Sequence, residues 1–340
     1  MRLKKVMAVM MAGLLAAGIL AGCGGSSASS GSSSGTAPAA DAADVGSNYK
    51  IDVILKTTSA EYWQYVQAGA NAAGKDLGVT VEVKGATSET AYDEQQNMIE
   101  TDLNSGAYDA IIIAPLQGDQ AATLVKGTSL PIFALDTDFE APEKISFIGT
   151  GNENAAALGG AAAVEAAKAA GWEEIKCIEI QGVQGDSTNT ARNKGYTRGV
   201  NDAGGEFLSN ELQFANAVAD QAVNCMEAIM QKYPEGIAII CANNDDMAMA
   251  AARAAKGNPA YEKTIFLGFN GDRAACEAIL AGQETMSVIQ DAYGMGYKSV
   301  ETAVAHMNGE TVETFVDSGS GVVDAETAQA RLDELAGYLK

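Results

Sequence analysis

The feature that most constrains the fold is a regular alternation of short, β-branched runs with helical stretches, which begins at Tyr49. Lys50–Leu55 and Val79–Lys84 are two of the short runs, and Glu61–Leu77 is the helical stretch between them. This order is typical of βαβ units, in which helices connect the parallel strands of one sheet. The sequence therefore predicts an α/β protein.

The alternation occurs in two series, which predicts two similar lobes, each built on a doubly wound parallel sheet. The length of 340 residues fits two lobes, because a domain usually holds roughly 100–200 residues. The expected strands are Lys50–Leu55, Val79–Lys84, Ala110–Ala114, Ile132–Leu135 and Ser146–Gly149, then Ile175–Ile180, Glu206–Leu212, Ile237–Cys241, Ile265–Gly268 and Met286–Ile289. The expected helices are Glu61–Leu77, Thr90–Ser105, Asp119–Lys126, Glu153–Ala170, Asn189–Ala203, Val218–Lys232, Asp245–Lys256, Arg273–Ala281 and Ala292–Asn308.

The first 22 residues differ from the rest of the chain. They begin with three basic residues between positions 2 and 5, and residues 6–21 are uncharged. This run is too short for an ordinary membrane-spanning helix and has the organisation of an export signal. It ends in Leu-Ala-Gly-Cys at 20–23, which resembles the lipobox of bacterial lipoproteins. We expect cleavage of residues 1–22, lipidation of Cys23, and anchoring to the outer face of a Gram-positive cell membrane.

Residues 24–47 consist almost wholly of Gly, Ser, Ala, Thr and Asp. Such a segment cannot bury enough apolar surface to offset the entropy lost on ordering. We therefore expect residues 23–48 to be a lipidated, flexible tether. The folded part would then work in water while the lipid holds it at the membrane.

The charge balance and the scarcity of histidine exclude several classes of function. The chain has 22 Lys and Arg against 44 Asp and Glu, a net charge of −22, and loss of residues 1–22 would make it −25. Nucleic-acid binding needs a basic surface and is therefore not expected. His306 is the one histidine, which disfavours His-based catalytic triads and clustered zinc sites. No nucleotide or calcium motif is present, so we expect no cofactor, no metal and no catalysis.

The residues that directly follow the expected strands are candidates for a ligand site, because open parallel sheets bind ligands beyond the carboxyl ends of their strands. These positions are rich in Asn, Asp and Gln, and Tyr62, Trp63 and Arg192 accompany them. Amides and carboxylates hydrogen bond to neighbouring hydroxyls, and an aromatic face covers an apolar ring face. This combination is the chemistry that a sugar needs.

Asn and Asp at such positions also cap helices, so each has a second interpretation. We interpret Asp245 and Asp272 as helix caps. We interpret Asn244, Asn270 and Gln290 as ligand contacts.

Three segments are specific enough to suggest a family: GDSTNTARNKGY at 185–196, CANNDDMA at 241–248 and LGFNG at 267–271. With them, residues 49–340 resemble the type 1 periplasmic binding proteins of the ribose/galactose-binding group. The resemblance implies two lobes joined by a three-strand hinge, a sugar in the cleft between them, and hinge closure on binding. It assigns residues 49–151 plus 291–318 to the N-terminal lobe, residues 152–290 plus 319–340 to the C-terminal lobe, and the hinge to Thr150–Glu153, Gln290–Ala292 and Asp317–Gly321.

The resemblance also implies roles for individual residues. Tyr62 and Trp63 match the aromatic pair that covers the sugar ring, and Asp136 matches a carboxylate that binds hydroxyls. Arg192 matches an arginine that binds the ring oxygen and hydroxyls, as its fork of donors would allow. The remaining site residues are expected to be Thr137, Asp186, Asn189, Asn216, Asn244, Asn270 and Gln290.

Departures from the family pattern leave the identity of the ligand open. Thr137 stands where ribose receptors have arginine, and Asn270 stands where many members have aspartate. A third aromatic residue is missing near Asn216, and Phe214 is the candidate to replace it.

The resemblance implies a monomeric solute-binding lipoprotein that captures a small polyhydroxylated ligand, most simply a monosaccharide, and delivers it to an ABC permease. Two alternatives stay open: a sensor partner of a membrane kinase or chemoreceptor, and an importer of a polyol, a nucleoside or a furanose-like signal. No close spacing indicates a disulfide, so pairing of the remaining cysteines also stays open: Cys177, Cys225, Cys241 and Cys276.

Overall fold

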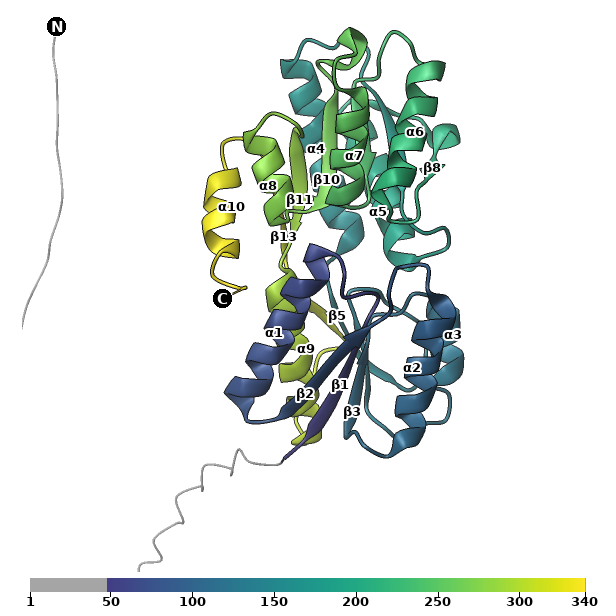
Figure 1. Cartoon of the computed structure of the whole chain (residues 1–340), viewed down its shortest axis with the longest axis vertical. Coiled ribbons are helices and arrows are strands. Elements are labelled where there is room, and N and C mark those ends of the chain that lie inside the picture. The colour runs from purple at the N-terminus through teal and green to yellow at the C-terminus, as the bar shows by residue number, and fades with distance from the viewer. Residues whose placement is uncertain (1–47, 340) are drawn as a thin grey trace, which may run out of the picture. The chain divides into compact units, whose positions relative to one another are not determined.

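The computed structural model describes residues 48–339, and the structural statements below concern only these residues. They form two α/β lobes, each built around its own sheet (Figure 1). The predicted export signal, Cys23 and the tether up to residue 47 lie outside the described residues. Within the described part, no helix is both long and apolar enough to span a membrane.

The first lobe holds a six-stranded, fully parallel sheet in the order β12-β5-β4-β3-β1-β2. Its strands are β1 (Lys50–Leu55), β2 (Thr80–Gly85), β3 (Ala110–Ile113), β4 (Ile132–Leu135), β5 (Lys144–Gly149) and β12 (Phe315–Asp317). Its helices are α1 (Glu61–Leu77), α2 (Tyr92–Ser105), α3 (Gly118–Leu124) and α9 (Ala292–Met307). The central strands β1 and β3 are buried along almost their whole length, as expected for parallel strands covered on both faces.

The second lobe holds a sheet in the order β13-β11-β10-β9-β6-β7, with β8 also paired to β6. All its pairs are parallel except that of β13 with β11. Its strands are β6 (Lys176–Gln181), β7 (Glu206–Phe207), β8 (Gln213–Phe214), β9 (Ile239–Ala242), β10 (Ile265–Asn270), β11 (Met286–Gln290) and β13 (Ser320–Val323). Its α-helices are α4 (Asn152–Ala169), α5 (Ser187–Asp202), α6 (Ala219–Lys232), α7 (Asp245–Ala255), α8 (Arg273–Leu280) and α10 (Ala328–Leu335).

The chain passes between the two sheets three times. These crossings lie between β5 and α4, between β11 and α9, and between β12 and β13. The first and third crossings contact each other, because Thr150 Oγ1 and Ser318 Oγ are 3.0 Å apart and the Ser318 amide donates to the Gly149 carbonyl at 2.8 Å. Each crossing is only a few residues long, so the lobes are connected by short segments.

Glycine allows one pair of helices in each lobe to pack at very short range. A Cβ on Gly69 of α1 would lie 1.9 Å from the carbonyl oxygen of Tyr293 in α9. A Cβ on Gly199 of α5 would lie 2.1 Å from the carbonyl oxygen of Ala157 in α4. Only glycine permits a backbone approach this close.

The two-series alternation is confirmed, but the strand predicted over Glu206–Leu212 is wrong. This stretch forms the two-residue strand β7, then a 3₁₀ turn over Ser209–Glu211 that leads into β8. Ser209 and Asn210 are exposed, so the segment lacks the burial that a continuous central strand would require. The short strands β12 and β13 overlap the two ends of the hinge segment expected at Asp317–Gly321, and α10 has no counterpart among the expected helices.

The described cysteines are all free thiols. Cys177 and Cys241 lie on the neighbouring strands β6 and β9, both fully buried, with their Sγ atoms 3.5 Å apart. They pack as small apolar side chains inside the second lobe.

Candidate functional site

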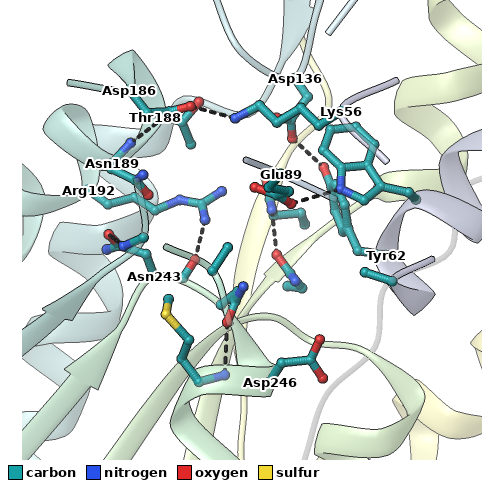
Figure 2. A pocket seen from close by; sticks show the side chains of 18 of the residues that line it. Lys56, Tyr62, Glu89, Asp136, Asp186, Thr188, Asn189, Arg192, Asn243 and Asp246 are labelled. Carbon is teal, nitrogen blue, oxygen red and sulfur yellow. Dashed lines mark hydrogen bonds and ion pairs between the residues drawn. The ribbon is translucent and has the colours of Figure 1, made fainter. Parts of the chain in front are cut away.

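A cavity lies between the two lobes and is lined by residues that follow strands or begin helices in both of them (Figure 2). Its volume is about 50 Å³, compared with roughly 10–15 Å³ for one water on the same kind of measure. The lining residues are Lys56, Ala60, Tyr62, Trp63, Glu89, Asp136, Gly182, Asp186, Thr188, Asn189, Arg192, Ala217, Asn243, Asn244, Asp246, Met247, Asn270, Asp272 and Gln290.

The first turn of α1 supplies an aromatic wall. The rings of Tyr62 and Trp63 meet edge to face, with centroids 5.1 Å apart at 82°. The Tyr62 hydroxyl donates to Asp136 Oδ1 at 2.7 Å, and Trp63 Nε1 donates to Glu89 Oε1 at 3.1 Å. Burial and the neighbouring Asp136 carboxylate hold the pKa of Tyr62 well above its ordinary value, so its hydroxyl stays a donor.

Asp136 lies directly after β4 in a left-handed backbone conformation, with φ of 61°. A non-glycine residue in this region carries strain, and such strain is concentrated at functional sites. Its second oxygen accepts a hydrogen bond from Thr137 Oγ1 at 2.8 Å. Asp136 is therefore a buried carboxylate held in one orientation by Tyr62 and Thr137.

Arg192 of α5 reaches into the cavity from the second lobe. Its guanidinium lies over the ring of Phe269, 3.6 Å from the centroid. Nε donates to Asn152 Oδ1 at 2.9 Å, and Nη1 donates to the carbonyl oxygen of Asn243. These contacts use part of the guanidinium fork and fix its plane, so the remaining donors have a defined direction.

Asn243 is itself positioned by a buried carboxylate behind the cavity. Its Nδ2 donates to Glu179 Oε1 at 2.8 Å, and its Oδ1 accepts from the Gly182 amide at 3.1 Å. Burial raises the pKa of Glu179 to about 6, and the surrounding amide donors limit this rise. Glu179 therefore fixes the side chain of Asn243, while the backbone carbonyl of the same residue accepts from Arg192.

A chain of amides forms the wall near α8. Gln290 Nε2 donates to Asn270 Oδ1 at 2.8 Å, and Asn270 Nδ2 donates to Asp272 Oδ2 at 3.2 Å. Asn270 has φ of 136°, a second strained backbone position at the cavity. Gln290 Oε1 is buried and has no hydrogen-bond partner among the described residues.

Direct polar contacts join the two lobes along one edge of the cavity. Lys56 Nζ, just after β1, pairs with Asp186 Oδ2 of the second lobe at 2.5 Å, and both side chains are nearly buried. Asp186 Oδ1 also caps α5 by accepting from the Asn189 amide at 2.9 Å. Thr137 Oγ1 and Thr188 Oγ1 are 3.0 Å apart across the same edge. Ser187 Oγ also donates to the Asp138 carbonyl at 2.9 Å, and Arg273 of α8 pairs with Glu61 of α1 at 3.2 Å, so ion pairs and hydroxyl contacts together join the lobes.

Nine of the eleven residues predicted to bind ligand line this cavity: Tyr62, Trp63, Asp136, Asp186, Asn189, Arg192, Asn244, Asn270 and Gln290. The other two do not. The Thr137 hydroxyl instead hydrogen bonds to Asp136 and lies within hydrogen-bond distance of Thr188 Oγ1. Asn216 hydrogen bonds to Gln221 Oε1 at 2.9 Å, and its neighbour Ala217 lines the cavity instead.

The predicted replacement aromatic and the predicted helix caps also differ from the structure. Phe214 lies on the short strand β8, is 39% exposed and is outside the cavity lining. Asn244 is the residue that caps α7, accepting from the Met247 amide at 2.9 Å, and it also lines the cavity. Asp245 is fully buried and accepts from Ser287 Oγ and the Asp272 amide. Asp272 stands at the N-cap of α8, but its side chain makes no capping bond and lines the cavity.

Sequence reasoning missed several lining residues: Lys56, Glu89, Thr188, Asn243 and Asp246. Lys56 follows β1 directly and Asn243 follows β9 directly, so the strand-end rule could have found both. Glu89 lies beyond β2 in a loop, where no pattern marks it.

Three comparisons identify relatives of this chain. A family profile described as the periplasmic binding protein domain matches residues 51–311. The D-apiose import binding protein of Paraburkholderia graminis is 31% identical over 70% of this chain and 74% of that protein. The D-allose-binding periplasmic protein of Escherichia coli is 28% identical over 76% of this chain and 85% of that protein.

A solved structure supports the same relationship. The carbohydrate transporter solute binding protein of Agrobacterium radiobacter, in complex with D-arabinose, is 30% identical, with a TM-score of 0.77 over 85% of this chain and 98% of that chain. Its agreement covers both lobes described above. The family profile matches most of the folded part of the chain. This chain therefore belongs to the periplasmic binding protein family, and its two parallel-sheet lobes have the type 1 fold of that family.

Proposed function

We propose that this protein is an extracytoplasmic solute receptor that captures a monosaccharide in the cavity between its lobes and delivers it to an ABC importer. The observation that carries the proposal is the combination of walls around one small cavity. An aromatic pair faces a fixed arginine fork and a chain of amides, and these groups match the apolar faces and the hydroxyls of a sugar ring.

The relatives support this class of ligand. Their names refer to import or binding of D-apiose and D-allose, and solved relatives hold D-arabinose and D-fucose. The small volume of the cavity, about 50 Å³, favours a single sugar unit over a longer chain.

Binding and release would require movement of the lobes but no chemical step. We place the hinge at the three crossings and divide the lobes at residues 49–151 plus 291–318 and 152–290 plus 319–340. A ligand that contacts both walls would favour the closed arrangement by as much as its affinity differs between the open and closed states. The closed form would then be the form that the permease recognises.

The proposed location of the protein rests on the sequence outside the described residues. The lipobox at 20–23 and the Ser- and Gly-rich tether support anchoring of the receptor through Cys23 to the outer face of the cell membrane, where we propose that it works as a monomer. Export of the Cys23→Ser variant tests this anchor. This variant should lack the lipid and should not be cleaved before position 23, and a fully processed, membrane-bound variant would contradict the lipid anchor.

A thermal-shift screen tests the proposed ligand class. Pentoses, hexoses, inositols and nucleosides should be compared, and a sugar should raise the melting temperature because it binds only the folded state. Affinity for the best sugar should fall at least tenfold in Arg192→Ala. Asn244→Asp provides a second test, because aspartate keeps the cap of α7 while it removes the amide donors.

Two results would count against this proposal. If none of the tested sugars or polyols changed the melting temperature, the ligand class would be wrong. If Arg192→Ala bound the sugar as tightly as the unaltered protein, the assignment of this cavity would be wrong.

A further inference from the structure

The charged residues that line the cavity are predominantly acidic. Two are basic, Lys56 and Arg192. Five are acidic: Glu89, Asp136, Asp186, Asp246 and Asp272. The cavity is therefore more acidic than its own basic groups can neutralise.

The contacts show which carboxylates are already compensated. Asp186 is paired with Lys56 at 2.5 Å, and Asp136 accepts hydrogen bonds from two hydroxyls. The Arg192 guanidinium is engaged by Asn152, by the Asn243 carbonyl and by the ring of Phe269. Among the described residues, none of the other three acidic groups has a basic side chain within 4.0 Å: Glu89, Asp246 and Asp272.

Two of these carboxylates lie on one wall, at the starts of neighbouring helices. Asp246 is in the first turn of α7 and Asp272 is at the N-cap of α8. Burial, followed by repulsion from Asp245, Glu61 and Asp246, holds the pKa of Asp272 well above its ordinary value. Partial enclosure at the cavity and then Glu61 raise the pKa of Asp246, although this residue is exposed and Arg253 opposes the rise. A positive charge at this wall would relieve both effects.

An independent observation shows that the same wall is short of donors. Asp272 Oδ2 accepts a hydrogen bond from Asn270 Nδ2 at 3.2 Å, and this contact orients the Asn270 amide. Asn270 Oδ1 then accepts a hydrogen bond from Gln290 Nε2 at 2.8 Å. This leaves Gln290 Oε1, in a side chain only 1% exposed, as a buried acceptor with no partner among the described residues. Leaving such a group unpaired costs roughly 1–3 kcal/mol, so a ligand that brought a donor to this oxygen would recover part of that free energy.

We infer that the ligand carries a protonated amino group on its polyhydroxylated frame, as an amino sugar does, and that Asp246 and Asp272 receive this ammonium while Gln290 Oε1 accepts a further hydrogen bond. The inference rests on the proposed function and narrows its ligand class. An ammonium offers three donors and one positive charge, whereas a neutral sugar offers hydroxyl donors alone and brings no positive charge to the two carboxylates.

Calorimetry with matched ligands on the full chain tests the inference. The probes are D-glucose, D-glucosamine and N-acetyl-D-glucosamine, with the corresponding galactose and mannose series and myo-inositol beside its monoamino form. At pH 7 the amine should bind at least tenfold more tightly than its neutral parent in the series that fits the cavity. The N-acetyl form should lose this advantage, because acetylation removes the charge and adds bulk.

Variants locate the effect. Asp272→Asn and Asp246→Asn should each reduce the preference for the amine, measured as the ratio of amine to neutral-sugar affinity in the same variant, to under threefold. Both replacements keep an acceptor oxygen, so folding should be retained, and the melting temperature checks this. Glu277→Gln is the matched control, since Glu277 lies on α8 outside the cavity and pairs with Arg273; it should keep the full preference.

Equal or tighter binding of the neutral parents would overturn the inference and leave the proposed function standing. An amine preference that survives in both asparagine variants would also overturn it. If neither neutral nor amino compounds bound, the inference and the proposed function would fail together.

Discussion

The ion pair between Lys56 and Asp186 offers the sharpest test of how the lobes close. The two residues come from different lobes, their charged atoms are 2.5 Å apart, and their side chains are 7% and 3% exposed. Asp186→Asn removes one charge but keeps the oxygen that caps α5. Lys56 would then lose the one carboxylate in direct contact with it, leaving the more distant Glu89 and Asp136, and the amide would present a donor to it.

Breaking a buried pair in this way costs roughly 3–5 kcal/mol. If the pair forms only when the lobes close, this free energy is lost from closure and appears in ligand affinity. At about 1.4 kcal/mol for each tenfold change, affinity should fall by roughly 100-fold to several thousand-fold. Calorimetry with the best-binding sugar of the screen measures this change.

Two further variants make the result interpretable. The double variant Lys56→Met with Asp186→Asn should bind more tightly than the two single effects would predict, because it leaves no charge unpaired. Glu165→Gln breaks the exposed pair with Lys168 in α4, where the side chains are 69% and 45% exposed, and it should leave affinity unchanged. If Asp186→Asn bound the sugar within threefold of the unaltered protein, the pair would have no part in closure.

Three other predictions concern stability and its dependence on pH. Gly199→Ala should lower the free energy of unfolding by roughly 1–3 kcal/mol because the new methyl would clash with the Ala157 carbonyl of α4, and an unchanged urea midpoint would contradict this packing. Tyr62→Phe should lower the free energy of unfolding by roughly 1.5–3 kcal/mol because buried Asp136 loses a hydrogen-bond donor. Tyr65→Phe removes a half-buried hydrogen bond to Glu61 and should lower the free energy of unfolding clearly less in the same thermal melts. The pKa of Glu179 is raised from 4.5 to about 6, so the folded state binds more protons between these values and stability falls as pH rises through them, by roughly 2 kcal/mol. Glu179→Gln should lack this fall in urea titrations at pH 4.5 and 7, and parallel pH profiles for the two proteins would refute the assignment.

The parts of the site that the sequence could predict are those fixed by local structure. Asp136, Asn243 and Gln290 all stand where a parallel strand ends, and the carboxyl ends of such strands share one edge of the sheet. Cavity-lining residues at these places follow from the strand pattern, and the aromatic pair that opens α1 lies in the segment that follows β1.

The parts that could not be predicted depend on how the lobes meet and on unusual backbone conformations. The contact of Lys56 with Asp186 joins residues 130 positions apart, and neither residue signals the other. Asn216 and Ala217 both have positive φ, 49° and 59°, which residues of these types seldom adopt in succession. This turn is where Ala217 replaces the expected Asn216 in the cavity lining.

The close packing of helices through glycine has a consequence for how mutations act. In each lobe, one member of the tightly packed pair starts directly after a crossing: α4 follows the first crossing and α9 follows the second. At Gly69 and Gly199 the helices pack too closely to slide past each other. Each lobe should therefore move as a rigid body, and the motion between the lobes should occur at the crossings. Substitutions at these glycines should therefore reduce how much folded receptor a cell keeps, whereas substitutions at the crossings should change how readily the folded receptor closes on its ligand.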